Sequence, residues 1–259
     1  MRLRIANRVF EPRVWALLLT AVTLAGFVSL GDWQLRRARE KQDQVASFAR
    51  GAQTSIVLED DATIDGLPRY QHVTTHGRYD VAHQILVDNM PSQAGRPGYR
   101  VLTPLLRPGA ARLLLVDRGW VPLGASRETL PTVDVGAEAR DVAGRLDQLP
   151  QPGVRVGEAG VTGDERWPRV LNFPRQADLE QVLGRPIEAR ILLLDPAAPD
   201  GYERAWRPAM GFGPERHLGY AIQWFALATT VFVVFVALSL HPIAPVPSNP
   251  ATPDDQTPP

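Results

Sequence analysis

Residues 216–240 read RHLGYAIQWFALATTVFVVFVALSL, and this stretch decides how the chain is organised. Behind the Arg-His pair stands a run of about 23 uncharged residues, and roughly 20 apolar residues suffice for a helix to cross a bilayer. At about 100° per residue, His217, Tyr220 and Trp224 fall on one helical face. The sequence therefore predicts a membrane span whose polar entrance carries an imidazole and two flat aromatic rings.

A second apolar run, VWALLLTAVTLAGFVSL at residues 14–30, follows a cationic start at residues 1–13. It is longer than a usual signal-peptide core and no Ala-x-Ala site follows, which favours a transmembrane helix over a cleaved signal. Residues 31–65 are rich in helix formers and predict a helical stalk and linker, with Trp33 as an interfacial anchor. The proline-rich residues 241–259 predict a disordered tail.

Residues 66–215 change to short runs of β-branched and aromatic residues divided by Gly, Pro and Asp, which is typical of strands. Residues 107–111 predict a hairpin loop. The predicted strands cover 69–79, 83–89, 99–106, 112–121, 140–148, 169–173 and 188–195, and the one predicted helix covers 176–183. The expected fold is a mostly β (α+β) extramembrane domain, an antiparallel sheet or small barrel, held between two transmembrane helices.

Composition excludes several kinds of chemistry. The formal net charge is zero, and without a basic block no nucleic-acid partner is expected. The chain has no cysteine, which excludes disulfides and thiolate metal sites. No catalytic motif is found, and spacing alone brings no nucleophile and base together, so we expect no enzyme. His72 and His76 would lie about 13 Å apart on a strand, too far to share one metal ion.

Two spans place both termini on one side of the membrane and residues 31–217 on the other. Cations near the membrane ends of the large loop argue weakly for a cytoplasmic domain. However, that rule weakens for long translocated loops, and a cationic terminus before the first span is usually retained inside. We therefore expect cytoplasmic termini and a periplasmic domain in a two-pass protein of the bacterial inner membrane.

Two groups of residues are candidate sites. In RGWVPLG at 118–124, Trp120 either folds back on the core from a turn or stands exposed beside Arg118 as a partner anchor. At the start of the second apolar run, a cation and aromatic rings suit a bilayer interface without any ligand. They also suit haem, because an imidazole is a common axial ligand, flat rings can lie against a porphyrin, and an arginine can pair with a propionate. The second group consists of Arg216, His217, Tyr220 and Trp224.

Five segments, taken in order, carry a family resemblance. They are GDWQLRRAREK (31–41), RYQHVTTHGRY (69–79), GYRVLTPL (98–105), LLVDRGWVPL (114–123) and HLGYAIQWFALA (217–228). Together they resemble the Surfeit locus protein 1 family in its bacterial form. The sequence departs from the family pattern at Asp117, where Asn is usual, and at Gln223, where Thr is frequent, and it matches loosely over 150–186.

The resemblance implies a non-enzymatic assembly factor for a haem-copper terminal oxidase, cytochrome c oxidase, acting on subunit I while haem a is inserted. It implies that His217 binds the haem iron. We further expect Arg118, Trp120 and Trp33 to contact a partner, and we expect the partners to be subunit I, haem a synthase and the lipid bilayer. Two other classes stay open: a membrane-anchored periplasmic enzyme, and a structural envelope protein that binds no haem.

Overall fold

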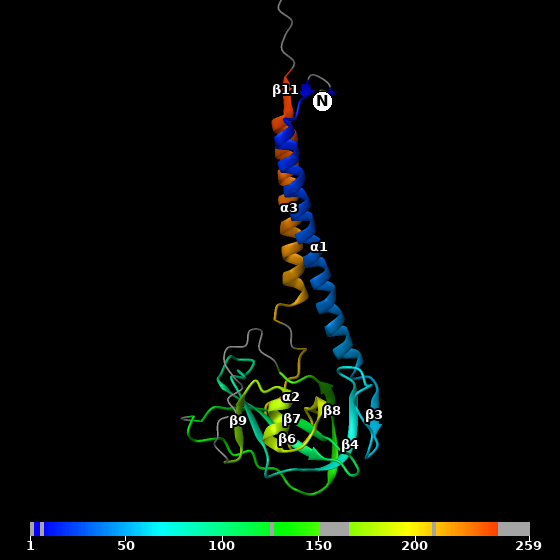
Figure 1. Cartoon of the computed structure of the whole chain (residues 1–259), viewed down its shortest axis with the longest axis vertical. Helices are drawn as coiled ribbons and strands as arrows, with labels where there is room; N and C mark the ends of the chain where they lie inside the picture. The colour runs from blue at the N-terminus through cyan, green and yellow to red at the C-terminus, as the bar shows by residue number, and fades with distance from the viewer. Residues whose placement is uncertain (1–2, 6–7, 125–126, 151–165, 209–210, 243–259) are drawn as a thin grey trace, which may run out of the picture. The chain divides into compact units, whose positions relative to one another are not determined.

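The computed structural model describes residues 3–5, 8–124, 127–150, 166–208 and 211–242 of the 259-residue chain. The chain forms two compact units (Figure 1). The first, here called the helical unit, combines Met1–Gln42 with Met210–Pro259, and the second, the barrel unit, is Asp43–Ala209.

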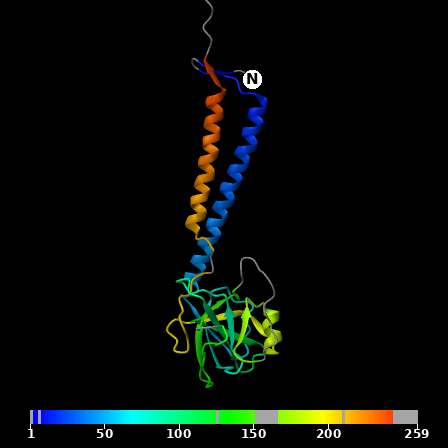
Figure 2. The same ribbon diagram turned by 90° about the vertical axis from the view of Figure 1, so that its left-hand side faces the viewer.

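The helical unit contains α3 (Pro214–Ser239) and residues 14–42 of α1 (Val14–Arg50), and these two long helices run side by side in both views (Figures 1 and 2). Each is long and apolar enough to cross a membrane. α1 continues from the apolar run into the predicted stalk without a break. The two helices with a larger domain between them in sequence are compatible with a two-pass membrane protein.

Small residues form the stripe along which α1 and α3 pack. A side chain at Gly31 would meet the ring of Phe225, because an added Cβ would lie 2.8 Å from it. Small side chains let helix backbones approach closely in the absence of a hydrophobic driving force in lipid. The buried positions along this stripe include Gly31, Ala38, Ala221 and Ala228.

A small antiparallel sheet of order β1-β2-β11 joins the outer ends of these helices. It is formed by β1 (Leu3–Ile5), β2 (Arg8–Phe10) and β11 (Leu240–Pro242). The sequence predicted no strand here. The first two residues of the expected disordered tail, 241–242, belong to β11, so that boundary is corrected; residues 243–259 lie outside the described part of the chain.

Five strands of the barrel unit close into a ring, which confirms the small-barrel expectation. In neighbour order they are β4 (His72–Tyr79), β8 (Arg140–Asp147), β10 (Ile187–Leu194), β7 (Leu113–Pro122) and β6 (Gly98–Leu106). β4 also pairs with β6, through Arg78 with Leu106 and Tyr79 with Leu105, and this pairing closes the ring. Closure removes the exposed edges that an open sheet of these strands would have.

Three further strands and one helix extend the barrel. They are β3 (Ser55–Leu58) beside β4, β5 (Ile85–Asp88) beside β6, β9 (Arg169–Asn172) beside β5, and α2 (Gln176–Leu183). The pairs β3/β4, β5/β9 and β7/β10 are parallel and the other pairs are antiparallel, so the barrel with its added strands is a mixed sheet. β3 lies inside the predicted linker 31–65, where four apolar or small residues are too short a run to signal a strand.

The other predicted elements agree with the structure to within a few residues. Seven predicted strands correspond to β4 to β10, and the predicted helix 176–183 corresponds to α2. The predicted loop 107–111 joins antiparallel β6 and β7, with the Ala110 amide donating to the Arg107 carbonyl at 3.3 Å. Val73, Leu114 and Leu146 belong to the larger core cluster of the barrel, and each is fully buried.

Candidate functional site

His217 lies in the first turn of α3 and contacts the other long helix. Its Nδ1 atom is 2.8 Å from Oε1 of Gln34 on α1. A carbonyl oxygen can only accept a hydrogen bond, so Nδ1 carries the ring proton and Nε2 keeps its lone pair. The contact therefore fixes both the orientation of the ring and the tautomer that leaves Nε2 able to bind a metal.

The helix stripe that contains His217 also holds Trp224. The Trp224 ring lies 5.5 Å from that of Phe27 on α1, at an interplanar angle of 38°. The stripe continues from His217 through Ala221 to Trp224, with alternating spacings of four and three residues. Tyr220 is turned about 60° from His217, away from Ala221, and its side chain is 44% exposed. Tyr220 therefore lies at the exposed border of the face that carries His217 and Trp224.

Arg216 and Trp33 are both exposed. The Arg216 guanidinium lies 4.7 Å from the Phe212 ring centroid, and among the described residues it forms no salt bridge. Trp33 is 45% exposed, with Arg37 stacked 5.9 Å from its ring centroid. Since Trp33 precedes Gln34 on α1, it points away from the His217 contact. These two side chains remain accessible to a ligand or partner.

Arg118, by contrast, is 2% exposed in the wall of the barrel. Its guanidinium lies 5.0 Å from the ring centroid of Tyr202 and 5.8 Å from that of Tyr79. Five acceptors within 3.4 Å of the guanidinium nitrogens come from four segments of the barrel unit. They are the carbonyls of Asp200, Val133 and Asp134, Oε1 of Gln84 and the hydroxyl of Thr103. Arg118 therefore joins several segments of the fold.

Trp120 is also buried, at 6% exposure, so the expectation of an exposed anchor is wrong. Its indole Nε1 donates to the Met90 carbonyl at 2.8 Å, and Arg96 lies 5.0 Å from the ring centroid. The ring packs over Gly98, where an added Cβ would be 2.5 Å from it. β7 continues to Pro122, so the residues expected to form a turn belong to a strand.

A buried acidic residue precedes Arg118. Asp117 is fully buried, accepts a hydrogen bond from Nε of Arg100 at 3.0 Å and accepts another from the Gly119 amide at 3.0 Å. Burial raises the pKa of the Asp117 carboxyl, while the Arg100 guanidinium acts in the opposite direction. Gly119 has φ of 112°, which favours glycine. Asp117 therefore stabilises the same strand of the barrel, β7, that carries Arg118.

The two strand histidines lie on β4, as predicted, and each contacts a different aspartate. His72 Nε2 is 2.9 Å from Asp195 Oδ2, and His76 Nδ1 is 2.9 Å from Asp141 Oδ1. Within the described ranges, no group of three His, Cys, Asp or Glu side chains could hold a metal ion.

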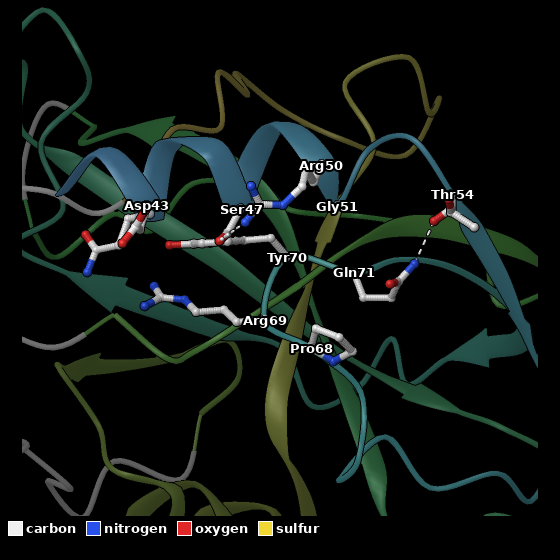
Figure 3. Close-up of a pocket in the computed structure, with 10 residues that line it drawn as sticks. Asp43, Ser47, Arg50, Gly51, Thr54, Pro68, Arg69, Tyr70 and Gln71 are labelled. Atoms are coloured by element: carbon white, nitrogen blue, oxygen red, sulfur yellow. Dashed lines mark hydrogen bonds between the residues drawn. The ribbon is translucent and has the colours of Figure 1, made fainter. Parts of the chain in front are cut away.

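A pocket of about 500 Å³ lies at the end of α1 (Figure 3). Arg69 and Tyr70 lie beneath the last turns of the helix, and Gln71 Nε2 donates to the Thr54 carbonyl at 2.6 Å. The two cations of the pocket have partners: Arg69 Nε is 2.6 Å from Asp147 Oδ1, and Arg50 is hydrogen-bonded to a serine hydroxyl. Both arginines that line the pocket are therefore already engaged within the fold.

Sequence reasoning missed two functional candidates. Gln34 lies 183 residues from His217; it belongs to the segment 31–41 that carries the family resemblance and to the helix stripe of Phe27 and Gly31, but neither signal pairs it with His217. Ser55 is hydrogen-bonded to His72 across 17 residues, and no spacing rule predicted that contact.

Comparison with known proteins places the chain in a family. A family model described as the SURF1 family matches residues 21–229, a range that includes the barrel unit and most of both long helices. A SURF1-like protein of Rickettsia conorii is 25% identical over 223 residues, which cover 84% of this chain and 88% of that protein. The chain therefore belongs to the SURF1 family, and this membership implies a role in cytochrome oxidase assembly.

Proposed function

We propose that this protein is an assembly factor that assists the insertion of haem a into subunit I of cytochrome c oxidase, and that this role in assembly is non-enzymatic. The observation that carries the proposal is the hydrogen bond between His217 Nδ1 and Gln34 Oε1, at 2.8 Å. It leaves the Nε2 lone pair available at the entrance of a membrane helix. Family membership supports the oxidase, and this side-chain arrangement supports haem as the cargo.

The residues around His217 fit a haem group. Histidines that bind metals commonly donate their second ring N–H to an oxygen acceptor, which sets the tautomer and strengthens the ligand. Gln34 supplies that acceptor here. Arg216, exposed and without a salt bridge among the described residues, would pair with a propionate, and Trp224 offers a flat ring. One axial histidine from this chain suits a cargo that has to be passed on.

The proposed orientation has both termini in the cytoplasm and the barrel unit in the periplasm of a bacterial inner membrane. It rests on the four arginines before the first span. The cysteine-free chain permits a clean test with single cysteines at Val57, which is 75% exposed, and at Ser248. An impermeant maleimide should label Val57→Cys in intact spheroplasts and Ser248→Cys only after lysis. The opposite pattern would reverse the orientation.

The proposed partners are subunit I, haem a synthase and the lipid bilayer. Direct contact with a protein partner requires accessible side chains, and of the three residues predicted for docking, only Trp33 is substantially exposed. We therefore assign docking to Trp33 on α1, and we assign Arg118 and Trp120 to shaping the barrel wall.

The decisive experiment is the absorption spectrum of the full chain, purified in detergent from a host that makes haem a. His217→Ala should remove most of the bound haem, while the helix persists because alanine is a strong helix former. His72→Ala and His76→Ala are matched controls on β4 and should keep the wild-type haem content. Equal haem in wild type and His217→Ala would overturn the site, and a colourless wild type would favour a structural protein.

A further inference from the structure

Three side chains that are distant in sequence meet where β3 joins the barrel. The Ser55 hydroxyl is 2.9 Å from His72 Nδ1, and His72 Nε2 is 2.9 Å from Asp195 Oδ2. Parallel pairing of β3 with β4 places Ser55 directly beside His72. Asp195 follows β10, where its amide donates to the Ala143 carbonyl at 3.0 Å. The backbone of three strands thus fixes the arrangement.

The direction of the hydrogen bonds follows from the groups involved. An ionised carboxylate can only accept, so His72 Nε2 carries a proton and donates it to Asp195. His72 Nδ1 then presents its lone pair to the Ser55 hydroxyl, which donates. The Thr74 hydroxyl lies 3.4 Å from Ser55 Oγ and can donate to it in turn. The imidazole is therefore oriented as a base toward the serine.

We propose that Ser55, His72 and Asp195 form a nucleophilic site for small esters, in which Ser55 attacks, His72 is the general base and Asp195 is a positioning residue. A nucleophile, a base within hydrogen-bond reach and a third group that orients the base define this kind of site on unrelated folds. The activity is separate from the proposed role in oxidase assembly and does not depend on haem.

The reacting groups are accessible from solvent. Ser55 is exposed, and the His72 and Asp195 side chains keep 19% and 32% of their accessible surface. Thr54 and Gln71, which line the pocket of Figure 3, alternate with Ser55 and His72 along their segments and so point to the other face. The ester would therefore approach from the open face of β3 rather than from that pocket.

The reaction would proceed in two balanced steps. Ser55 Oγ forms a bond to the ester carbonyl carbon while its proton passes to His72 Nδ1. The ester C–O bond then breaks, and the alkoxide leaves with that proton as an alcohol. In the second step water attacks the acyl-serine with His72 again as base, releasing the carboxylic acid and restoring Ser55.

The chain contains a matched control for this site on the same strand. His76 also pairs with an aspartate, Asp141, at 2.9 Å, and its side chain is 50% exposed. In the described part of the chain, no serine or threonine hydroxyl is hydrogen-bonded to His76. A histidine-aspartate pair without a nucleophile is therefore available for comparison.

The first test is covalent labelling of the full chain in detergent with a fluorophosphonate probe, with the adduct located by peptide mass spectrometry. We expect an adduct on Ser55 that Ser55→Ala abolishes and that forms about a hundredfold more slowly in His72→Gln, since general-base catalysis contributes at least about that factor. Asp195→Asn should also slow labelling, and His76→Gln should not. No Ser55 adduct in wild type, or an equal rate in His72→Gln, would mean that these hydrogen bonds only fasten β3 to the barrel.

A second test keeps the proposal decidable if a variant at His72 or Asp195 destabilises the barrel. In the cysteine-free chain, Ser55→Cys introduces a single thiol beside the histidine, and Val57→Cys introduces an exposed thiol on the same strand. Iodoacetamide should alkylate Ser55→Cys at least about tenfold faster, because a neighbouring imidazole promotes the thiolate. Equal rates would overturn the proposal. Unchanged haem content in Ser55→Ala would separate this site from the one at His217.

Discussion

Arg118 in the barrel and His217 on the paired helices use their hydrogen-bonding capacity in opposite ways. Arg118 is buried and donates to acceptors from several segments of the barrel unit. His217 is partly buried, and among the described residues it has one hydrogen-bond partner, at Nδ1, and none at Nε2. The side chain of Arg118 is therefore committed to stabilising the fold, whereas His217 retains the Nε2 lone pair for binding a ligand.

The largest expected effect is the loss of stability when Arg118 is replaced. Arg118→Ala leaves several buried acceptors without a donor, and each such group costs about 1 to 3 kcal/mol. We expect the free energy of unfolding of the full chain in detergent to fall by about 4 kcal/mol, measured by chemical denaturation. Arg78→Ala, at an exposed position on β4, is the control and should change it by less than about 0.5 kcal/mol. A small change in the free energy of unfolding for Arg118→Ala would contradict its structural role and would return Arg118 to the candidates for docking a partner.

Trp120 and Trp33 differ in the same way, since Trp120 is buried in the barrel and Trp33 is exposed on α1. Trp120→Ala should lower the free energy of unfolding by about 3 kcal/mol, because it opens a cavity in a packed wall and removes the donor to Met90. Trp33→Ala should leave thermal melting nearly unchanged and weaken co-purification with subunit I, since Trp33 is exposed. If Trp120→Ala melted like wild type but lost the partner, the assignments of the two residues would exchange.

The sequence predicted most elements of the barrel, because alternation and turn residues act locally. Seven strands, α2 and both apolar helices follow from such patterns. Strand order, the parallel pairs and closure through β4 and β6 depend on pairings between distant segments, which no local pattern contains. β3 was missed because its four residues are too few to show a period.

The candidate sites divide in the same way. Helical periodicity predicted that His217 and Trp224 share a face, and the structure places both along the stripe that packs on α1. It could not predict Gln34 as the partner of His217, nor the meeting of Ser55, His72 and Asp195, since each requires the tertiary fold. Of the two alternatives for Trp120, packing on the core is confirmed and the exposed anchor is wrong; the glycine and proline beside it are typical of a turn, while here β7 continues through them.

A smaller effect is expected when His217 loses its partner. Gln34→Leu removes the acceptor that fixes the ring, and loss of such a partner typically weakens metal binding about 10- to 100-fold. We expect the dissociation constant for haem a to rise by that factor, as measured by spectroscopic titration of the purified chain. Gln42→Leu, on an exposed position of the same helix, should bind like wild type. Equal affinity in all three proteins would show that His217 needs no orienting partner.

The smallest expected effect on the free energy of unfolding is that of Tyr79→Phe, beside Arg118. The Tyr79 hydroxyl is buried and, within the described residues, has no hydrogen-bond partner. Burial, followed by the nearby Asp200 carboxylate, raises the pKa of Tyr79 to about 12. At neutral pH both the folded and the unfolded chain keep this proton, and Tyr79→Phe removes a buried hydroxyl that has no partner among the described residues, so the free energy of unfolding should rise by about 1 kcal/mol.

Alkaline solution should separate wild type from Tyr79→Phe. Above pH 10 the unfolded tyrosine ionises while the folded one remains neutral until pH rises to about 12, so the wild type loses stability with rising pH in this window. The stability advantage of the phenylalanine variant over wild type should therefore be about 1 kcal/mol larger at pH 11 than at pH 7, measured by denaturant titration at both pH values. A variant that is already less stable at pH 7 would mean that the hydroxyl has a partner and belongs to the hydrogen-bonded group around Arg118.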